Sequence, residues 1–358
     1  MRVRAALLWA TIPMAFVVAA IGQTPERSAN VEEITQWARS GHSDFHSESF
    51  AHWNEDGAIP PVCATCHSGA GFRSLYGLDG SEPGLPQTPV PVGGVVDCDT
   101  CHNPGLATID AIRLPSGEQH PVTGYEAACM TCHQGRASSA TVAKAVGTTA
   151  EDEVNAELGF INPHYAIAAA SLLGGSGQLG YQYPGKSYEP RFIHARPVST
   201  CISCHEPHNL TVAPETCLTC HQSGESEAIR ISRQSYDGSG NLQQGIHDDI
   251  KANRQRLFSL MVEYSSEVAG TPLVYDGARH PYFFADHNAD GIVDQVEGAP
   301  VPYASWTPRL LKAAYNWKFV GADGGIHVHN PHYALQLLFD SAEDISNALG
   351  RDLTNMVR

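Results

Sequence analysis

The sequence predicts a mainly α-helical chain with extensive irregular loops. Apolar residues recur at three- and four-residue intervals in four segments, near residues 163–173, 248–265, 308–319 and 331–349. A shorter helix is expected near residues 31–39, and Thr307 before Pro308 is typical of a helix start. Glycine and proline are concentrated between Gly69 and Val96, which favours irregular structure there.

Residues 1–22 have the pattern of a secretory signal peptide. Arg2 and Arg4 form a basic start, an apolar run follows from Ala5 to Ile21, and small residues at Ala20 and Gly22 offer cleavage sites. The run is marginal in length for a membrane span, so an uncleaved anchor that tethers the chain to a membrane is the alternative. No later stretch approaches about 18 apolar residues. We therefore expect a soluble mature chain in the periplasm or outside the cell.

All ten cysteines fall in one repeated pattern, Cys-x-x-Cys-His. The five copies are Cys63, Cys66 and His67; Cys98, Cys101 and His102; Cys129, Cys132 and His133; Cys201, Cys204 and His205; and Cys217, Cys220 and His221. This spacing is that of c-type haem attachment, in which two thiols form thioethers and the histidine is the proximal iron ligand. The sequence therefore predicts five haem c groups and, because every thiol is used, no disulfide.

Each attached haem leaves a sixth iron position to be filled. Thirteen histidines lie outside the motifs, whereas Met261 and Met356 are the only methionines outside both the motifs and the predicted signal. Ligation by two histidines is therefore favoured, which places the haems toward the reducing end of their range. The six best candidates are His42, His52, His164, His194, His208 and His329. Because six candidates compete for five irons, at least one of them is not a ligand.

Sequence context selects four of these candidates. His208 follows a motif histidine by three residues, and His194 precedes Cys201 by seven, so both are close to haem-bearing segments. His42 and His52 flank a stretch with several aromatic residues just ahead of the first motif. Apolar neighbours of this kind suit a buried iron ligand.

The other two candidates belong to a repeat. The tetrapeptide Asn-Pro-His-Tyr occurs at residues 162–165 and 330–333, and each copy is expected to open an amphipathic helix. The first copy contributes His164. His329 directly precedes the second copy and competes there with His332.

A separate metal site is predicted near the carboxyl end. Residues 286–297 match a twelve-residue calcium loop, with glycine at position 6 and oxygen ligands at the required positions. The predicted ligands are Asp286, Asn288, Asp290, the carbonyl of Ile292, Asp294 and Glu297. A structural Ca²⁺ ion is expected there, and the alternative is a polar turn without metal.

The positions of the motifs suggest how the chain is divided into regions, and its charge bears on its partners. We expect a five-haem region at 23–225 and a C-terminal helical region at 226–358, which carries the calcium loop and one distal ligand and packs on the same core. The chain would wrap around a packed haem core that supplies much of the apolar interior. It has 22 basic side chains against 38 acidic ones, so nucleic acid is not expected as a partner.

The motifs, together with Cys-His-Glu-Pro-His at 204–208 and His-Asn-Pro-His-Tyr at 329–333, resemble those of bacterial multihaem c-type cytochromes. The segment Trp-Thr-Pro-Arg-Leu-Leu at 306–311 and the residues after it are also similar to that group. In such proteins the histidine of His-Asn-Pro usually serves as a distal ligand, which implies His329 rather than His332. The group includes electron carriers, extracellular conduits and reductases, so the resemblance does not fix a substrate.

Three functions remain open at this point. The leading hypothesis is electron transfer to redox partner proteins or an extracellular acceptor. A reductase of a small nitrogen or sulfur compound would need one open iron position. All five motifs end in histidine, so the lysine-ended variant of ammonia-forming nitrite reductases is absent. A third possibility is a homo-oligomer that forms a conductive filament.

Overall fold

The computed structural model describes residues 25–358, and side-chain surroundings from residue 31 onward. The predicted signal peptide at 1–22 lies outside the described residues. Helices outweigh strands and long loops join them, as the sequence predicts. Within the described part of the chain, no helix has the length and apolar character needed to cross a membrane.

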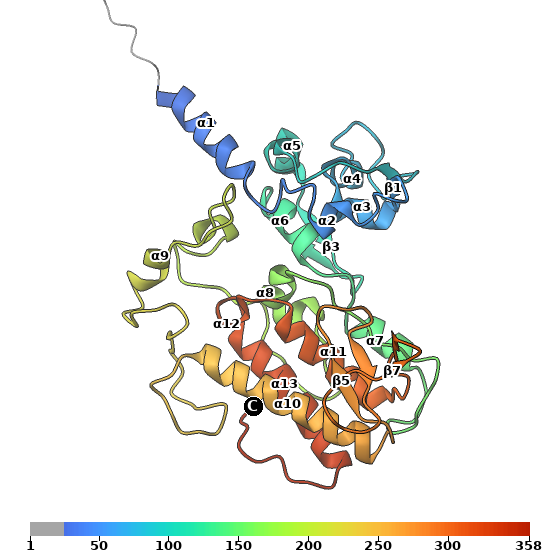
Figure 1. The fold of residues 1–358 in the computed structure, drawn as a ribbon. Coiled ribbons are helices and arrows are strands. Elements are labelled where there is room, and N and C mark those ends of the chain that lie inside the picture. The colour runs from blue at the N-terminus through green and yellow to red at the C-terminus, as the bar shows by residue number, and fades with distance from the viewer. Residues whose placement is uncertain (1–24) are drawn as a thin grey trace, which may run out of the picture.

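The segment of residues 25–133 consists of short helices and two small antiparallel strand pairs, which form the blue-to-green upper part of Figure 1. Its helices are α1 Pro25–Trp37, α2 Glu48–Ala51, α3 Pro61–His67, α4 Gly69–Leu75, α5 Cys98–His102, η1 Pro104–Thr108 and α6 Glu126–His133. Its antiparallel strand pairs are β1 Ala58–Ile59 with β2 Val90–Pro91, and β3 Ala111–Arg113 with β4 Gln119–Pro121.

The longest helices lie in the remainder of the chain, together with several short ones. The helices are α7 Ser139–Val146, α8 Ala168–Gly177, η2 Cys201–Ser203, α9 Pro214–Leu218, α10 Ile246–Glu267, α11 Pro308–Gly321, α12 Ile326–His329 and α13 Pro331–Ala348. The antiparallel strand pairs are β5 Leu273–Tyr275 with β6 Phe283–Ala285, and β7 Gln295–Val296 with β8 Ala299–Pro300.

The apolar core lies among α10, α11 and α13, in the lower part of Figure 1. Helix α11 is buried along almost its whole length, because α10, α13 and α7 cover it. Asn316 on this helix is fully buried and satisfied: its amide donates to the Tyr181 carbonyl oxygen at 2.9 Å and to Ser341 at 3.0 Å. One apolar cluster joins these helices to residues 112–181, so the core crosses the predicted boundary at residue 225.

Three of the predicted amphipathic helices are confirmed as α10, α11 and α13. The helix expected at 31–39 is the end of α1, which stops at Trp37. The helix expected at 163–173 begins only at Ala168, because His164 and Ala166 have positive φ angles of 104° and 50°. Backbone in that region cannot continue a right-handed helix.

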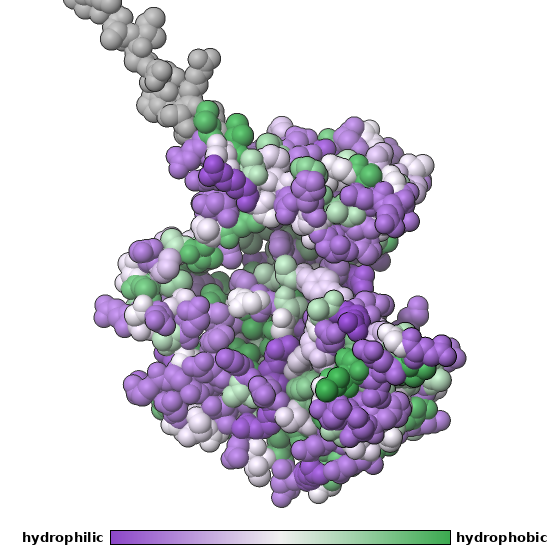
Figure 2. All heavy atoms as spheres, viewed as in Figure 1, coloured by the Kyte–Doolittle hydropathy of each residue, from purple (hydrophilic) through white to green (hydrophobic). Residues whose placement is uncertain are grey.

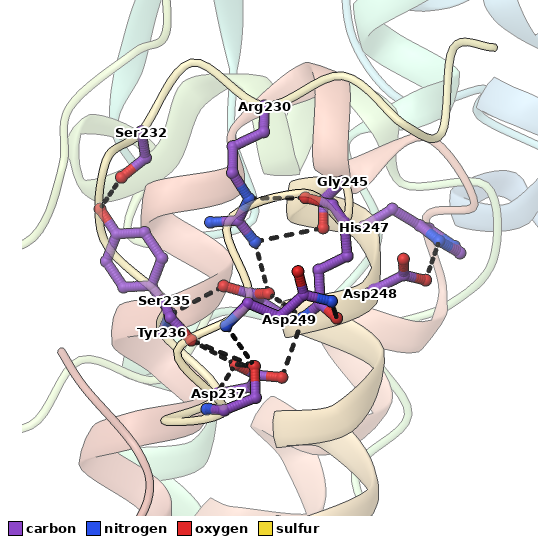
Figure 3. A network of polar contacts seen from close by, with 12 residues as sticks. Arg230, Ser232, Ser235, Tyr236, Asp237, Gly245, His247, Asp248 and Asp249 are labelled. Atoms are coloured by element: carbon purple, nitrogen blue, oxygen red, sulfur yellow. Dashed lines mark hydrogen bonds and ion pairs between the residues drawn. The ribbon is translucent and has the colours of Figure 1, made fainter. Parts of the chain in front are cut away.

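A buried polar network anchors the start of α10, as Figure 3 shows. The Arg230 guanidinium lies 2.5 Å from Asp249, and both side chains are almost fully buried. The Asp249 carboxylate also accepts the Tyr236 backbone N–H at 2.8 Å. Asp237 accepts hydrogen bonds from Ser239 and others, which closes the preceding loop as a turn.

Candidate functional site

The five Cys-x-x-Cys-His motifs occupy helices or helical turns. Helices α3, α5 and α6 end at the motif histidines His67, His102 and His133. The fourth motif begins in η2 and the fifth in α9, and both leave the helix before their histidine. A separation of three residues places both thiols of a motif on one helical face, as attachment to a single group requires.

Each motif histidine lies opposite one histidine from elsewhere in the chain. The ring centroids are separated by 5.8 Å for His67 and His164, 6.0 Å for His102 and His208, 6.3 Å for His133 and His42, 6.2 Å for His205 and His329, and 6.1 Å for His221 and His194. Five of the six predicted distal histidines are therefore brought to a motif histidine, each to a different one.

The common spacing suits a metal between the rings. A metal–imidazole bond is about 2 Å, and the nitrogen lies roughly 1 Å from the ring centroid, so imidazoles on opposite sides of one metal have centroids about 6 Å apart. Aromatic stacking covers a similar range of distances. The angles between the ring planes, however, range from 8° to 81°, so the pairs share a separation without sharing a stacking geometry.

The Nδ1 atoms of five of these rings contact oxygen atoms, which leaves Nε2 of each ring for a metal. Three rings contact backbone carbonyl oxygens: His67 that of Ser49 (2.6 Å), His133 that of Ala166 (2.6 Å) and His194 that of Ala195 (3.2 Å). Two rings contact carboxylates: His208 that of Glu206 (3.1 Å) and His329 that of Asp323 (2.7 Å). Such contacts fix the tautomer and ring orientation of metal-binding histidines. The carbonyl partners could not be predicted from the sequence, since any residue type can supply one.

One segment serves two motifs. Residues 162–166 carry His164, which faces His67, and the Ala166 carbonyl oxygen, which accepts from His133. Asn162 accepts the His164 backbone N–H at 3.0 Å and holds the unusual backbone. The first and third motifs are thereby held by the same short turn.

Burial favours the neutral form of four of the ten paired imidazoles. Burial, followed by the charges of Arg136 and His67, lowers the pKa of His164 to about 4. Burial also lowers the pKa of His42 and of His205. Metal ligation requires neutral imidazole, so these environments suit it. Against the effect of burial, the hydrogen bond and the charge of Asp323 instead raise the pKa of His329.

Neighbouring motifs touch through their cysteines. Cys66 Sγ lies 3.5 Å from the Thr131 carbonyl oxygen, and Cys132 Sγ lies 3.9 Å from the Cys66 carbonyl oxygen. A contact between the two thiols lowers the pKa of Cys66, and that contact together with burial raises the pKa of Cys132. Cys129 and Cys201 make a similar thiol contact. The first, third and fourth motifs therefore lie in a row.

The remaining two motifs adjoin this row. Cys101 is close enough to Cys129 for their charges to interact, and Cys217 is similarly close to Cys204. The second motif thus lies beside the third, and the fifth beside the fourth.

On the face drawn in Figure 2, a hollow separates the upper part of the molecule from the lower part.

His52 is the predicted distal residue that faces no motif histidine in these five pairs. Its Nδ1 lies 2.6 Å from the Glu48 carboxylate one helical turn earlier, and its side chain is 57% exposed. Its ring packs on Trp53, and Trp53 in turn packs on His67. Glu48, four residues before His52, was the sequence signal for this alternative partner.

The second Asn-Pro-His-Tyr copy differs from the first. Asn330 accepts the Tyr333 backbone N–H at 3.2 Å and caps α13, with Pro331 in the first turn. His329 faces His205, whereas His332 packs against Tyr236 at 5.6 Å. The geometry therefore favours His329 at this position.

The predicted calcium loop forms a turn between β6 and β7. The Asp286 carboxylate accepts the backbone N–H groups of Asp290 at 3.0 Å and Gly291 at 2.9 Å. Asp294 instead contacts the His287 ring at 2.6 Å. Among residues 25–358, no three His, Cys, Asp or Glu side chains are grouped to hold a metal ion. The turn has the loop's backbone pattern without converged ligands, so calcium stays a prediction.

Comparisons with known proteins agree with the motifs. The C-type polyheme cytochromes OmcC and OmcB of Geobacter sulfurreducens are each 24% identical to this chain, over 91% and 87% of it and 48% and 47% of their own lengths. This distant similarity supports a multihaem c-type cytochrome. The chain spans about half the length of these curated relatives. No protein-family model and no solved structure matches it.

Proposed function

We propose that this chain transfers electrons through five covalently attached c-type haems, each held between a motif histidine and a second histidine. The observation that carries the proposal is the set of five histidine pairs, in which every motif histidine has its own partner at 5.8–6.3 Å. Haem bound in this way supplies one-electron reduction and oxidation with no free iron position for a substrate.

The chain's own residues would bind and orient the groups. The motif thiols anchor each group, and His42, His164, His194, His208 and His329 fill the distal positions. The carbonyl oxygens of Ser49 and Ala166 orient two of the proximal rings. His52 receives no iron in this assignment, because its ring packs on Trp53 and is paired with no motif histidine.

The contacts between motifs support a continuous path. The thiol contacts Cys66–Cys132 and Cys129–Cys201 connect the first motif to the third and the third to the fourth. The fifth motif follows beside the fourth, and the second branches from the third. Electrons would thus enter near one end of this row and leave near the other.

Partners and location rest on less direct support. Redox partner proteins or an extracellular acceptor are proposed, because the relatives are named as cytochromes and the chain is acidic. Export to the periplasm or the cell exterior is proposed from the signal-like pattern of residues 1–22.

The test is low-temperature electron paramagnetic resonance of the fully oxidised holoprotein, with haem content measured alongside. Five low-spin ferric centres per chain are expected, because both axial positions of every iron are filled. One stoichiometric high-spin centre would contradict the proposal and point to a reductase with an open iron position.

A further inference from the structure

The five histidine pairs differ in what their Nδ1 atoms contact. His67, His133 and His194 meet neutral backbone carbonyl oxygens. Only His208 and His329 meet carboxylates among the described pairs. A carboxylate places a full negative charge where a carbonyl places a partial one, so these two pairs stand apart electrostatically.

Asp323, the partner of His329, is held in place and shielded from water. Its side chain is 4% exposed, and its Oδ2 lies 2.7 Å from His329 Nδ1. Its other oxygen accepts the Gly325 backbone N–H at 3.0 Å, and Ser171 on α8 also hydrogen-bonds to it. The carboxylate therefore cannot turn away from the ring, and little solvent screens its charge.

Glu206, the partner of His208, is held less firmly. Its side chain is 41% exposed and lies 3.1 Å from His208 Nδ1. It also accepts the backbone N–H groups of His208 and Asn209. Solvent screens an exposed charge of this kind, so its effect on the ring is weaker than that of Asp323.

A buried carboxylate acts on an axial ligand in one direction. It draws the Nδ1 proton, raises the basicity of the ring and places negative charge near the iron. The ferric state carries one more positive charge than the ferrous state, so this charge stabilises the oxidised form. The result is a lower reduction potential, with no change in spin state.

We propose that Asp323 makes the haem held by His205 and His329 the lowest-potential centre of the five. The inference rests on the proposed function, because it takes this histidine pair as the axial ligands of one iron. It assigns Asp323 as a positioning and tuning residue, which acts through His329 and contacts no substrate.

A spectroscopic redox titration of the wild-type holoprotein provides the first test. One of five one-electron components is expected to lie below the other four. Five components with no distinct lowest member would overturn the proposal, and this measurement needs no variant to fold.

The second test is Asp323→Asn, which keeps the size of the side chain and removes its charge. The reduction potential of the lowest component is expected to rise by about 59 mV, which is a roughly tenfold change in the equilibrium constant of a one-electron reduction. Glu206→Gln is the matched control and should shift another component by less than half as much. Asp323→Glu should restore most of the wild-type value.

Spin state separates the two proposals. Five low-spin centres in Asp323→Asn, with no shift or one no larger than in Glu206→Gln, would overturn the role of Asp323 alone. A high-spin centre already present in the wild-type protein would instead contradict the proposed histidine ligation.

Discussion

Residues 182–235 and the helices α10, α11 and α13 differ sharply in how their interiors are filled. The first segment carries the fourth and fifth motifs, and none of its residues is buried as a whole, although the Arg230 side chain is almost fully enclosed. The three helices supply nearly half of the main apolar cluster, with side chains such as Leu257, Leu310 and Leu338 fully buried. The three helices are thus stabilised by their own packing, whereas residues 182–235 place only a few side chains, such as Tyr183 and Tyr188, against the core. If haem is attached at these two motifs as proposed, residues 182–235 should depend on it for a fixed structure more than the three helices do.

The largest expected effect is the loss of structure in 182–235 without haem. In apoprotein made without haem attachment, backbone amides of this segment should exchange with solvent freely, while those of α10, α11 and α13 stay protected. Hydrogen–deuterium exchange of apoprotein and holoprotein measures the difference. Equal protection of 182–235 in both forms would remove the contrast.

The next prediction concerns single histidines. His329→Ala should convert one of five low-spin haems to high spin, because it removes an axial ligand of one iron. His332→Ala is the matched control and should leave all five low-spin. The same comparison applies to His42→Ala against His52→Ala. A high-spin centre in either control would mean that His332 or His52, and not the proposed histidine, is the ligand.

A smaller effect, on the stability of the whole protein, is expected where residues 182–235 meet the start of α10. Asp249→Ala leaves the buried Arg230 guanidinium unpaired and should lower the free energy of unfolding by about 3–5 kcal/mol. Glu263→Ala removes an exposed ion pair with Arg351 and should cost about 1 kcal/mol or less. Denaturant unfolding of both variants measures this, and equal losses would mean that the network in Figure 3 stabilises nothing beyond a surface contact.

The smallest expected effect tests whether the C-terminal region also depends on an ion. If residues 286–297 bind calcium, the holoprotein should melt a few degrees higher in millimolar Ca²⁺ than in a chelator, as ligand linkage requires. Glu297→Gln, in an exposed turn, should abolish the difference and leave the backbone hydrogen bonds of Asp286 intact. Identical melting in both buffers would leave the loop as a polar turn.

The three long helices of the core were predictable from sequence, and the short helices of the motifs were not. Helices α10, α11 and α13 bury one face in a protein core, so their residues repeat at helical intervals. Helices α3, α5 and α6 are only one or two turns long, and their residue types are set by cysteine spacing. Their pattern therefore carried no periodic signal.

The candidate site was also predictable from the sequence only in part. The motif residues are fixed by their own spacing, and the candidate distal histidines could be selected from nearby residues. Which histidine faces which motif could not be predicted, because His42 precedes the first motif yet faces His133 of the third. Asp323 was missed for the same reason, since its effect depends on its contact with His329.

The crossed pairing of His67 with His164 also has a consequence for the order of assembly. A chain that is exported with its amino end first presents His67 well before His164, with the second and third motifs in between. The first iron site would be anchored early and completed late. The pair of His67 and His164 could form only after the residues around 164 have emerged. Until then, the first site would have one histidine ligand and would be exposed to solvent.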